Sequence, residues 1–368
     1  MSEELRCIGC GSILQDQDPK KSGYLPTSAL KKALTSDDNE VYCQRCFRLR
    51  HYNEIMPVEE NNDDFLALLN SISQKKALVV NVVDLFDFSN SLISSIKRFI
   101  GGNEYILVGN KVDLFPKNSK ESKIKDWMRQ EANRNGLKPE KIFLVSAAKK
   151  KNLADLMAFL AKKGEKKDIY FVGTTNVGKS TLINAIINMN SDLKDVITTS
   201  KFPGTTLDEI KIPLSNGHYL IDTPGILNAN QLASHLSGKE LEVVEPKKPL
   251  KPATYQLLPG QTIFLAGLGR FDYVDGPSAG FTIYVADLYV HRTKTENADT
   301  FYEKHKDDLL LPPSKEDNLG PLKGQTFSPK EKSDILFGGV GFITTPANVV
   351  VKAYTPEGIG LGIRRALI

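Results

Sequence analysis

The order of apolar and polar positions divides the chain into a middle part of alternating strands and helices and a C-terminal part made mainly of strands. In the middle part, continuous apolar runs, typical of strands buried on both faces, alternate with runs of helical periodicity. The predicted strands are Ala77–Val83, Tyr105–Val108, Ile142–Val145, Asp168–Val172 and Tyr219–Ile221, and the predicted helices are Leu92–Ile100, Ser122–Asn133, Leu153–Ala161 and Thr181–Met189. This alternation predicts an α/β fold with a doubly wound, mainly parallel sheet.

The last third of the chain has the pattern of a β-rich domain. Apolar, aromatic-rich strand patterns at Thr262–Val274 and Phe281–His291 flank the turn signal Asp275-Gly276-Pro277. Further strands are predicted at Gly338–Thr344, Val349–Tyr354 and Gly360–Leu367, a helix and a loop within Phe301–Phe327, and an extended connector around Pro246, Pro249, Pro252 and Pro259. No acid–base pair or metal-ligand cluster stands out in this part, so we expect it to bind a partner.

Composition argues against a secreted or membrane-spanning protein. Of the 368 residues, 40% are apolar and 25% are charged, and no apolar run approaches the roughly 20 residues that span a bilayer. The N-terminal sequence MSEELRCIGC lacks the apolar core of a signal peptide. We therefore expect a soluble, cytoplasmic protein that does not bind membranes. The chain is too long for one ordinary core, and we divide it into domains at residues 1–60, 61–230 and 231–368.

Four cysteines form two C-x-x-C pairs near the N-terminus. Cys7 and Cys10 make the first pair and Cys43 and Cys46 the second, with 32 residues between the pairs. Two-residue spacing lets both thiolates face one ion, and four thiolates complete a closed tetrahedral shell, so the pattern predicts structural zinc. A redox thiol pair and four buried thiols are the alternatives, and neither explains two pairs. We expect a loop at Gln15–Asn39 between them.

The segment FVGTTNVGKST, residues 171–181, contains the phosphate-loop motif G-x-x-x-x-G-K-S. Gly173, Gly178, Lys179 and Ser180 hold its fixed positions, after a predicted strand and before a predicted helix, as the motif requires. The glycines let successive N–H groups point at one anion at a helix N-terminus. We expect Lys179 to bind the β- and γ-phosphates and the Ser180 hydroxyl to bind Mg²⁺. The predicted nucleotide contacts of this loop also include Asn176, Val177 and Thr181.

The tetrad Asn110-Lys111-Val112-Asp113 ends another predicted strand and matches the guanine signature N-K-x-D. The Asp113 carboxylate can accept hydrogen bonds from guanine N1–H and the 2-amino group, which adenine does not offer in that arrangement. We expect Asn110 to contact the other edge of the base and to brace the phosphate loop, and the stem of Lys111 to cover the ring. The chain is therefore predicted to bind GTP and GDP.

Two segments after the phosphate loop have the pattern of switch elements. Asp222-Thr223-Pro224-Gly225 matches D-x-x-G, in which Asp222 would hold a Mg²⁺-bound water and the Gly225 N–H would sense the γ-phosphate. Pro203-Gly204-Thr205-Thr206 stands in the position of the first switch, where a threonine would close on Mg²⁺ and the γ-phosphate. The candidate catalytic residues are Lys179, Thr206, Asp222 and Gly225.

These motifs resemble those of translation-factor-class GTPases, but they occur in the circularly permuted order: specificity loop, Ser-Ala loop, phosphate loop, switch I, switch II. With the four-cysteine module and the long C-terminal extension, the whole chain resembles the YqeH family of ribosome-biogenesis GTPases. The resemblance implies a GTPase switch in assembly of the small (30S) ribosomal subunit, with 16S rRNA, ribosomal proteins or a precursor particle as partners. It also favours Thr206 over Thr205, because Leu207-Asp208 follows Thr206 much as in the family pattern.

The Ser-Ala loop departs from the family pattern at one position. Ser146 and Ala147 are present, but Ala148 stands where the usual Ser-Ala-Lys has its lysine. Base stacking by that lysine is lost unless Lys149 replaces it, which predicts weak nucleotide affinity. The Ala147 N–H remains able to contact guanine O6.

Two further positions bear on the hydrolysis of GTP. Ile226 follows Gly225, where Ras-type enzymes carry the glutamine that orients the attacking water, so we expect hydrolysis to be slow or to use another group. Asn176 matches the asparagine that coordinates K⁺ in potassium-activated GTPases of similar sequence, and a K⁺ ion there could supply positive charge. A loop-bracing amide is the alternative for Asn176.

Charge gives modest support for RNA binding. Residues 231–368 carry 16 basic and 16 acidic side chains, and residues 61–230 carry 24 and 18. The local candidates, each with a solvated cationic surface as an equal alternative, are Arg45, Arg48, Arg50, His51, Arg270, His291-Arg292-Thr293-Lys294, Arg364 and Arg365. The second hypothesis for function is a guanine-nucleotide-dependent binding module with a protein or RNA target off the ribosome. A third, a redox or metabolic enzyme using the cysteines, has no substrate site in the sequence.

Overall fold

The computed structural model describes residues 5–8, 12–35, 41–52, 59–60, 62–117, 119–190, 210–214, 217–226, 232, 235–236, 238–317 and 319–368. The chain forms two compact units. The first consists of Met1–Leu85, Ser91–Val112 and Met128–Leu227, and the second of Phe86–Asn90, Asp113–Trp127 and Asn228–Ile368. Two short segments from the middle of the chain thus belong to the same unit as the C-terminal part, and the division into three domains remains a prediction.

A six-stranded sheet forms the centre of the first unit, in the order β4-β3-β2-β5-β7-β6. Its strands are β2 (Ala77–Asp84), β3 (Glu104–Asn110), β4 (Ile142–Leu144), β5 (Asp168–Val172), β6 (Ile210–Pro213) and β7 (Tyr219–Asp222). Neighbouring strands from β4 to β7 run parallel, and β6 runs antiparallel to β7. The predicted α/β fold with a mainly parallel sheet is therefore confirmed.

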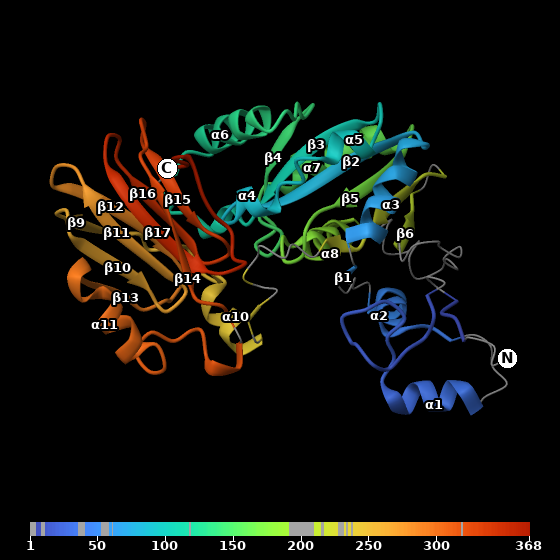
Figure 1. The fold of residues 1–368 in the computed structure, drawn as a ribbon. Coiled ribbons are helices and arrows are strands. Elements are labelled where there is room, and N and C mark those ends of the chain that lie inside the picture. Colours follow the sequence, from blue (N-terminus) through green and yellow to red (C-terminus); the bar gives the residue numbers. More distant parts are fainter. Residues whose placement is uncertain are drawn as a thin grey trace. The chain divides into compact units, whose positions relative to one another are not determined.

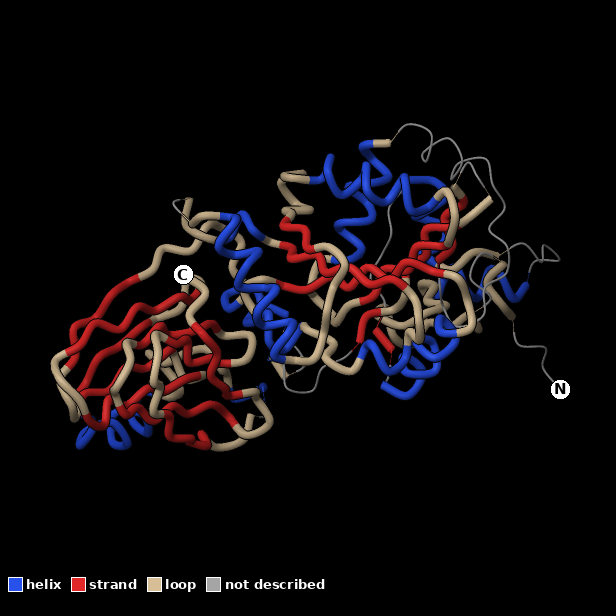
Figure 2. The backbone as a smooth tube through the Cα atoms, turned by 90° about the horizontal axis from the view of Figure 1, so that it is seen from above, coloured by secondary structure: helices blue, strands red, loops and turns tan. Residues whose placement is uncertain are grey.

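Helices lie on both sides of this sheet (Figure 2). The helices α7 (Leu153–Gly164) and α8 (Lys179–Met189) share one apolar core with the strands, in which Leu156 and Ile183 join Val80. All eight residues of β2 are buried, which explains why its sequence is a continuous apolar run. The other helices of the middle part are α3 (Asn62–Ser73), α4 (Phe88–Ser91), α5 (Ile96–Phe99) and α6 (Glu121–Arg134).

The prediction of one helix over Leu92–Ile100 was wrong. The segment contains only the short helix α5, with α4 ending just before it. The Ser91 hydroxyl accepts a hydrogen bond from the Asp84 N–H (3.0 Å) and donates one to the Asp84 carbonyl (3.3 Å). These two hydrogen bonds tie Ser91 to the end of β2, and α4 ends at Ser91.

Two five-stranded antiparallel sheets form the core of the second unit (Figure 1, orange to red). One has the order β13-β10-β11-β17-β14 and the other β18-β15-β16-β12-β9. Their strands are β9 (Ala253–Leu257), β10 (Gln261–Leu265), β11 (Gly269–Asp275), β12 (Ala279–Val285), β13 (Val290–Lys294), β14 (Leu322–Phe327), β15 (Ser333–Phe337), β16 (Gly341–Thr345), β17 (Val350–Pro356) and β18 (Leu361–Arg365). The unit also contains α10 (Gly238–Val244), α11 (Thr295–His305) and the 3₁₀ helix η3 (Lys315–Asp317).

Several strand predictions for this unit need correction. The pattern Thr262–Val274 contains two strands, β10 and β11, because a tight turn at Ala266–Leu268 is itself buried and leaves no polar signal. Phe281–His291 likewise divides between β12 and β13. The predicted proline-rich connector contains β9, an edge strand between Pro252 and Pro259, where proline is tolerated. The strands β14 and β15 were not predicted.

The N-terminal cysteines lie in a small module with its own apolar cluster. It contains α1 (Thr27–Thr35) and α2 (Gln44–Tyr52), and Leu14 and Leu25 pack with the buried cysteines. The predicted loop between the cysteine pairs was therefore wrong in part, because α1 occupies its middle and packs Leu30 against the cluster. Among the described residues, no helix is long and apolar enough to cross a membrane.

Candidate functional site

The phosphate loop connects β5 to α8 and requires glycine at two positions. Gly178 has φ +82°, and a Cβ atom there would lie 2.4 Å from Nδ2 of Asn110. A Cβ atom on Gly173 would lie 2.7 Å from the carbonyl oxygen of Val82. Because α8 begins at Lys179, directly after the loop, its N-terminal N–H groups and helix dipole face the position that a phosphate would take.

Lys179 is turned toward the D-x-x-G segment. Its Nζ contacts Oδ1 of Asp222 and the carbonyl oxygen of Thr223, and the side chains of Lys179 and Asp222 are 6% and 0% exposed. The two residues come together because Asp222 ends β7, which pairs with β5 at Phe171. Burial lowers the pKa of Lys179, and the charge of Asp222 opposes that shift.

The end of the D-x-x-G segment is hydrogen-bonded to the phosphate loop. The Thr175 N–H donates to the carbonyl of Ile226 (2.8 Å), and the Ile226 N–H donates to the carbonyl of Gly173 (3.2 Å). Gly225–Ile226 forms the strand β8, which also pairs in parallel with β1 (Glu59–Glu60). The two motifs therefore form one continuous structure.

One amide joins the guanine motif, the phosphate loop and the Ser-Ala loop. Asn110 ends β3, its Nδ2 donates to the Val177 carbonyl (2.9 Å), and its Oδ1 accepts a hydrogen bond from the Ala147 N–H (3.0 Å). Asn110 thus braces the phosphate loop in the way the sequence predicted. The Ala147 N–H would have to be shared or released to reach guanine O6, and that contact remains a prediction.

The other residues of the guanine motif and of the Ser-Ala loop differ in exposure and in their partners. Lys111 has φ +67°, and its Nζ lies 2.7 Å from Oδ2 of Asp84, a partner that the sequence analysis missed. Asp113 is half-buried in the short 3₁₀ helix η1 (Val112–Leu114). Ser146 is buried and its hydroxyl accepts a hydrogen bond from the Lys149 N–H (3.0 Å), whereas Ala148 is exposed.

The remaining predicted nucleotide contacts follow the loop into α8. Val177 and Ser180 are buried, Thr181 is exposed, and Asn176 is exposed with φ +62°. Thr206, the predicted first-switch residue, lies outside the described residues, and so does Cys10.

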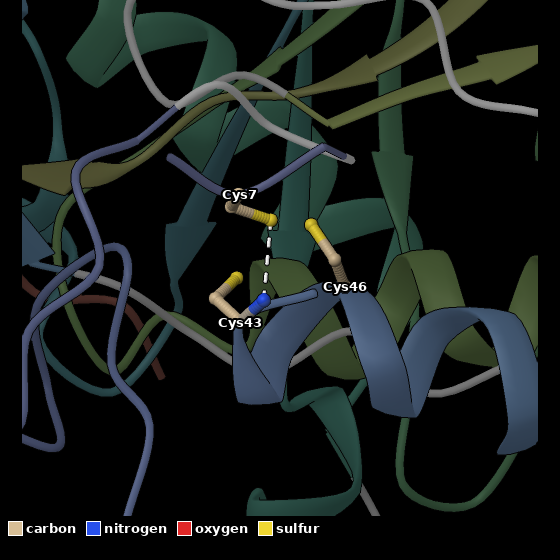
Figure 3. A group of neighbouring side chains, drawn as sticks. All are labelled: Cys7, Cys43 and Cys46. Atoms are coloured by element: carbon tan, nitrogen blue, oxygen red, sulfur yellow. Dashed lines mark hydrogen bonds between the residues drawn. The ribbon is translucent and has the colours of Figure 1, made fainter. Parts of the chain in front are cut away.

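Three of the four predicted zinc ligands meet in the N-terminal module. Figure 3 shows the sulfur atoms of Cys7, Cys43 and Cys46 directed toward a common point, and all three lie within 4.8 Å of one another. The Cys43 N–H donates to Sγ of Cys7 (3.2 Å). A tetrahedral zinc with bonds of about 2.3 Å would hold its sulfur ligands roughly 3.8 Å apart, so the cluster fits a zinc ion.

Arg45 reaches the nucleotide site, which the sequence analysis did not predict. It lies on α2 and is 5% exposed, and its Nη2 is 2.9 Å from Oδ2 of Asp222. It is therefore neither part of a solvated basic turn nor available to RNA, in contrast to both interpretations of the sequence. No local pattern indicates this contact, since the two residues are 177 positions apart.

Two of the C-terminal RNA candidates are also buried. Arg270 binds both carboxylate oxygens of Asp272 (2.8 and 2.9 Å), and Nε of Arg364 lies 3.3 Å from Oδ2 of Asp334. Internal carboxylates neutralise both arginines, so neither is offered to a phosphate group. Arg292 and Lys294 on β13 are exposed, as is Arg365.

Comparison with known proteins gives the family. Residues 278–367 match a family model described as "YqeH-like, C-terminal", and residues 168–250 match one described as "50S ribosome-binding GTPase". The protein YqeH of Bacillus subtilis, described as uncharacterized, is 47% identical over 100% of both chains. The NO-associated protein 1, chloroplastic/mitochondrial, of Arabidopsis thaliana is 29% identical over 92% of this chain and 69% of its own.

The solved structure of YjeQ from Thermotoga maritima is 23% identical over 41% of this chain and 48% of its own, with a TM-score of 0.26, too low to support an argument. The 47% identity to YqeH over the whole length and the two matching family models show the family of this chain. This chain belongs to the YqeH family of circularly permuted GTPases.

Proposed function

We propose that this GTPase is a nucleotide-dependent switch in assembly of the small ribosomal subunit. Its partners would be 16S rRNA, ribosomal proteins or a precursor particle, and its location the cytoplasm. The description of the model that matches residues 168–250 supports a role at the ribosome, although that description names the 50S subunit. The choice of the small subunit rests on the family resemblance of the motif order and the cysteine module.

The contact between the D-x-x-G segment and the phosphate loop supports the proposal of a nucleotide-dependent switch. In the structure Lys179 binds Asp222, and Ile226 is hydrogen-bonded to Gly173 and Thr175. A γ-phosphate that binds Lys179 must draw it away from Asp222, so gain and loss of phosphate would change the structure of this segment. Because the chain runs on from Ile226 into the C-terminal part, the change would pass directly to the partner-binding region.

The roles of the site residues are part of this proposal. In the GTP complex, Lys179 would bind the β- and γ-phosphates, Ser180 and Thr206 would bind Mg²⁺, and Asp222 would hold a Mg²⁺-bound water. Gly225 would sense the γ-phosphate through its N–H. The specificity for guanine would come from Asn110, Lys111, Asp113 and Ala147.

The proposal is tested by co-sedimentation with purified ribosomal subunits in the presence of GDP, a non-hydrolysable GTP analogue, or no nucleotide. We expect enrichment on the small subunit with the analogue and loss of that enrichment in Lys179→Ala. Enrichment on the large subunit would correct the choice of subunit. Absence from both subunits, with GTP binding intact, would instead favour a guanine-nucleotide-dependent module with a target off the ribosome.

A further inference from the structure

Arg45 brings a cation from the cysteine module into the nucleotide site. The helix α2 carries both Cys46 and, one residue earlier, Arg45. The cysteine side chain joins the sulfur cluster, while the guanidinium reaches Asp222 at 2.9 Å in surroundings that leave both residues almost without solvent contact. The same turn of helix therefore links the metal-binding cluster to the D-x-x-G carboxylate.

The two oxygens of Asp222 are bound by different cations. Oδ1 contacts Lys179 and Oδ2 contacts Arg45. Two buried positive charges thus meet at this buried carboxylate, and a phosphate group beside them would be a second anionic partner for both cations. The positive charge of Arg45 also contributes to lowering the pKa of Lys179, after the larger effect of burial. A nucleotide phosphate is the anion that the neighbouring loop is built to hold.

A second contact holds the module near the same point. The strand β1, which follows the module in the chain, pairs in parallel with β8, with Glu59 opposite Gly225. Gly225–Ile226 is thereby held between the phosphate loop and the segment that leaves the module. The Gly225 end of the D-x-x-G segment thus contacts the N-terminal part of the chain at two places, through Arg45 on α2 and through the backbone of β1.

We propose that Arg45 is a catalytic residue of GTP hydrolysis, supplied by the cysteine module of the same chain. Its guanidinium binds Asp222 in the structure, and it moves to the γ-phosphate when GTP and Mg²⁺ engage Lys179 and Asp222. A water oxygen forms the new bond to the γ-phosphorus, and the bond to the β–γ bridging oxygen breaks with its electron pair staying on GDP. One proton of the water stays on the inorganic phosphate and the other passes to a phosphate oxygen or to solvent, and GDP and inorganic phosphate leave. The guanidinium transfers no proton and neutralises the charge that develops on the phosphoryl oxygens.

This role meets a need that the D-x-x-G segment leaves open. Ile226 has no polar group with which to orient water or to stabilise charge, so the site needs a charge-stabilising group from elsewhere. Arginines that act in this way in other GTPases contribute about 10³- to 10⁵-fold in kcat. Since Arg45 lies next to Cys46, loss of the metal would remove the arginine from the site. The rate of GTP hydrolysis would then fall as the metal is lost.

The test compares Arg45→Ala and Arg45→Lys with Arg48→Ala, a matched control that removes the same charge one turn further along α2. Single-turnover GTP hydrolysis and the affinity for a fluorescent GDP analogue, alone and with aluminium fluoride, are measured over a range of K⁺ and Mg²⁺ concentrations. We expect Arg45→Ala to lower the hydrolysis rate about 100-fold or more and to abolish the added affinity from aluminium fluoride, with GDP affinity nearly unchanged. Arg45→Lys should restore only part of the rate, because an ammonium lacks the planar fork of a guanidinium.

The inference rests on the proposed phosphate site, and the two can fail separately. Wild-type nucleotide affinity in Lys179→Ala would refute the phosphate site, whatever Arg45 does. Normal hydrolysis in Arg45→Ala, with tighter Mg²⁺ binding, would show that Arg45 only competes for Asp222 and would overturn the catalytic role. Normal, K⁺-dependent hydrolysis in that variant would overturn it in favour of a cation at Asn176. Should Arg45→Ala misfold, a wild-type rate in Arg45→Lys would count equally against the role.

Discussion

At the scale of single residues, the absence of a side chain at Gly178 lets the Asn110 amide lie against the phosphate loop. Its φ of +82° is unfavourable for other residues, and a Cβ atom would displace the Asn110 amide, 2.4 Å away. Asn110 in turn holds Val177 and Ala147. We expect Gly178→Ala to lower the free energy of unfolding by about 3 kcal/mol, from backbone strain and two weakened hydrogen bonds, and to abolish GTP binding. Denaturant unfolding and nucleotide titration measure the two effects.

Gly136→Ala is the matched control for that variant. Gly136 has φ +72°, but nothing lies within 4 Å of the position of its Cβ atom. We expect it to cost only the backbone strain of about 1 kcal/mol and to leave GTP binding intact. Equal destabilisation by the two substitutions would show that the Asn110 contact has no importance for the loops.

The specificity for guanine is a second property of a single side chain. In Asp113→Asn the carboxylate becomes an amide, which can donate to the 2-oxo group of xanthine but no longer accepts two hydrogen bonds from guanine. We expect GTP affinity to fall roughly 10- to 100-fold, the loss expected for hydrogen bonds to a charged group, and XTP to bind in its place. Competition between GTP and XTP for a fluorescent nucleotide measures the change. An unaltered preference for GTP would assign recognition of the base to another residue.

At the scale of elements, the N-terminal module depends on its metal because its apolar cluster is very small. Among the described residues of the module, Leu14 and Leu25 are the apolar side chains buried beside the cysteines, too few to hold α1 and α2 in place without an ion. We expect about one zinc per chain, lost in Cys46→Ser, and faster hydrogen exchange across both helices after chelation. Metal analysis and hydrogen-exchange mass spectrometry check this. His51→Ala, which removes a ring whose centre lies 4.3 Å from that of Phe47 at an interplanar angle of 38°, should keep the zinc.

At this scale, the sequence predicts those features that depend on residues close together in the chain. The parallel strands were found nearly to the residue because burial on both faces leaves a continuous apolar run, as in β2. The loops were found because phosphate and guanine chemistry requires fixed spacings. The pairing of Arg45 with Asp222 and the break at Ser91 could not be found, because each depends on where a side chain points in the folded chain.

At the scale of the whole molecule, the segment after the guanine motif is part of the second compact unit. Asp113–Trp127 belongs to the same unit as the C-terminal sheets. The Leu250 N–H donates to the carbonyl of Leu114 (2.7 Å), and Nε1 of Trp127 donates to the carbonyl of Arg365 (3.0 Å). Asp113, the residue proposed to bind the guanine base, thus begins a segment that the C-terminal part holds by hydrogen bonds. We infer that guanine binding and the conformation of the C-terminal part influence each other.

Arg364 is the centre of this connection. Its guanidinium lies 4.9 Å from the ring centres of both Trp127 and Phe342, and its Nε pairs with Asp334. Arg364→Ala would leave the Asp334 carboxylate buried without this partner, at a cost of about 3–5 kcal/mol. We expect a lower melting temperature and a changed fluorescence of Trp127, the single tryptophan of the chain.

The same variant tests whether the connection reaches the base. If Trp127 positions the segment that begins at Asp113, Arg364→Ala should also weaken GDP binding, although no described contact joins Arg364 to the nucleotide motifs. Arg365→Ala is the control, since its side chain is half-exposed and lies 3.7 Å from Glu331, and such a surface pair contributes at most about 1 kcal/mol. Normal GDP affinity in a folded Arg364→Ala protein would mean that the C-terminal part holds this segment without influencing recognition of the base. Weakened GDP affinity would make the C-terminal part a regulator of the guanine site. A partner that binds the C-terminal part and changes the affinity for the nucleotide must have its own affinity changed by the nucleotide by the same factor, because the two binding equilibria are thermodynamically linked.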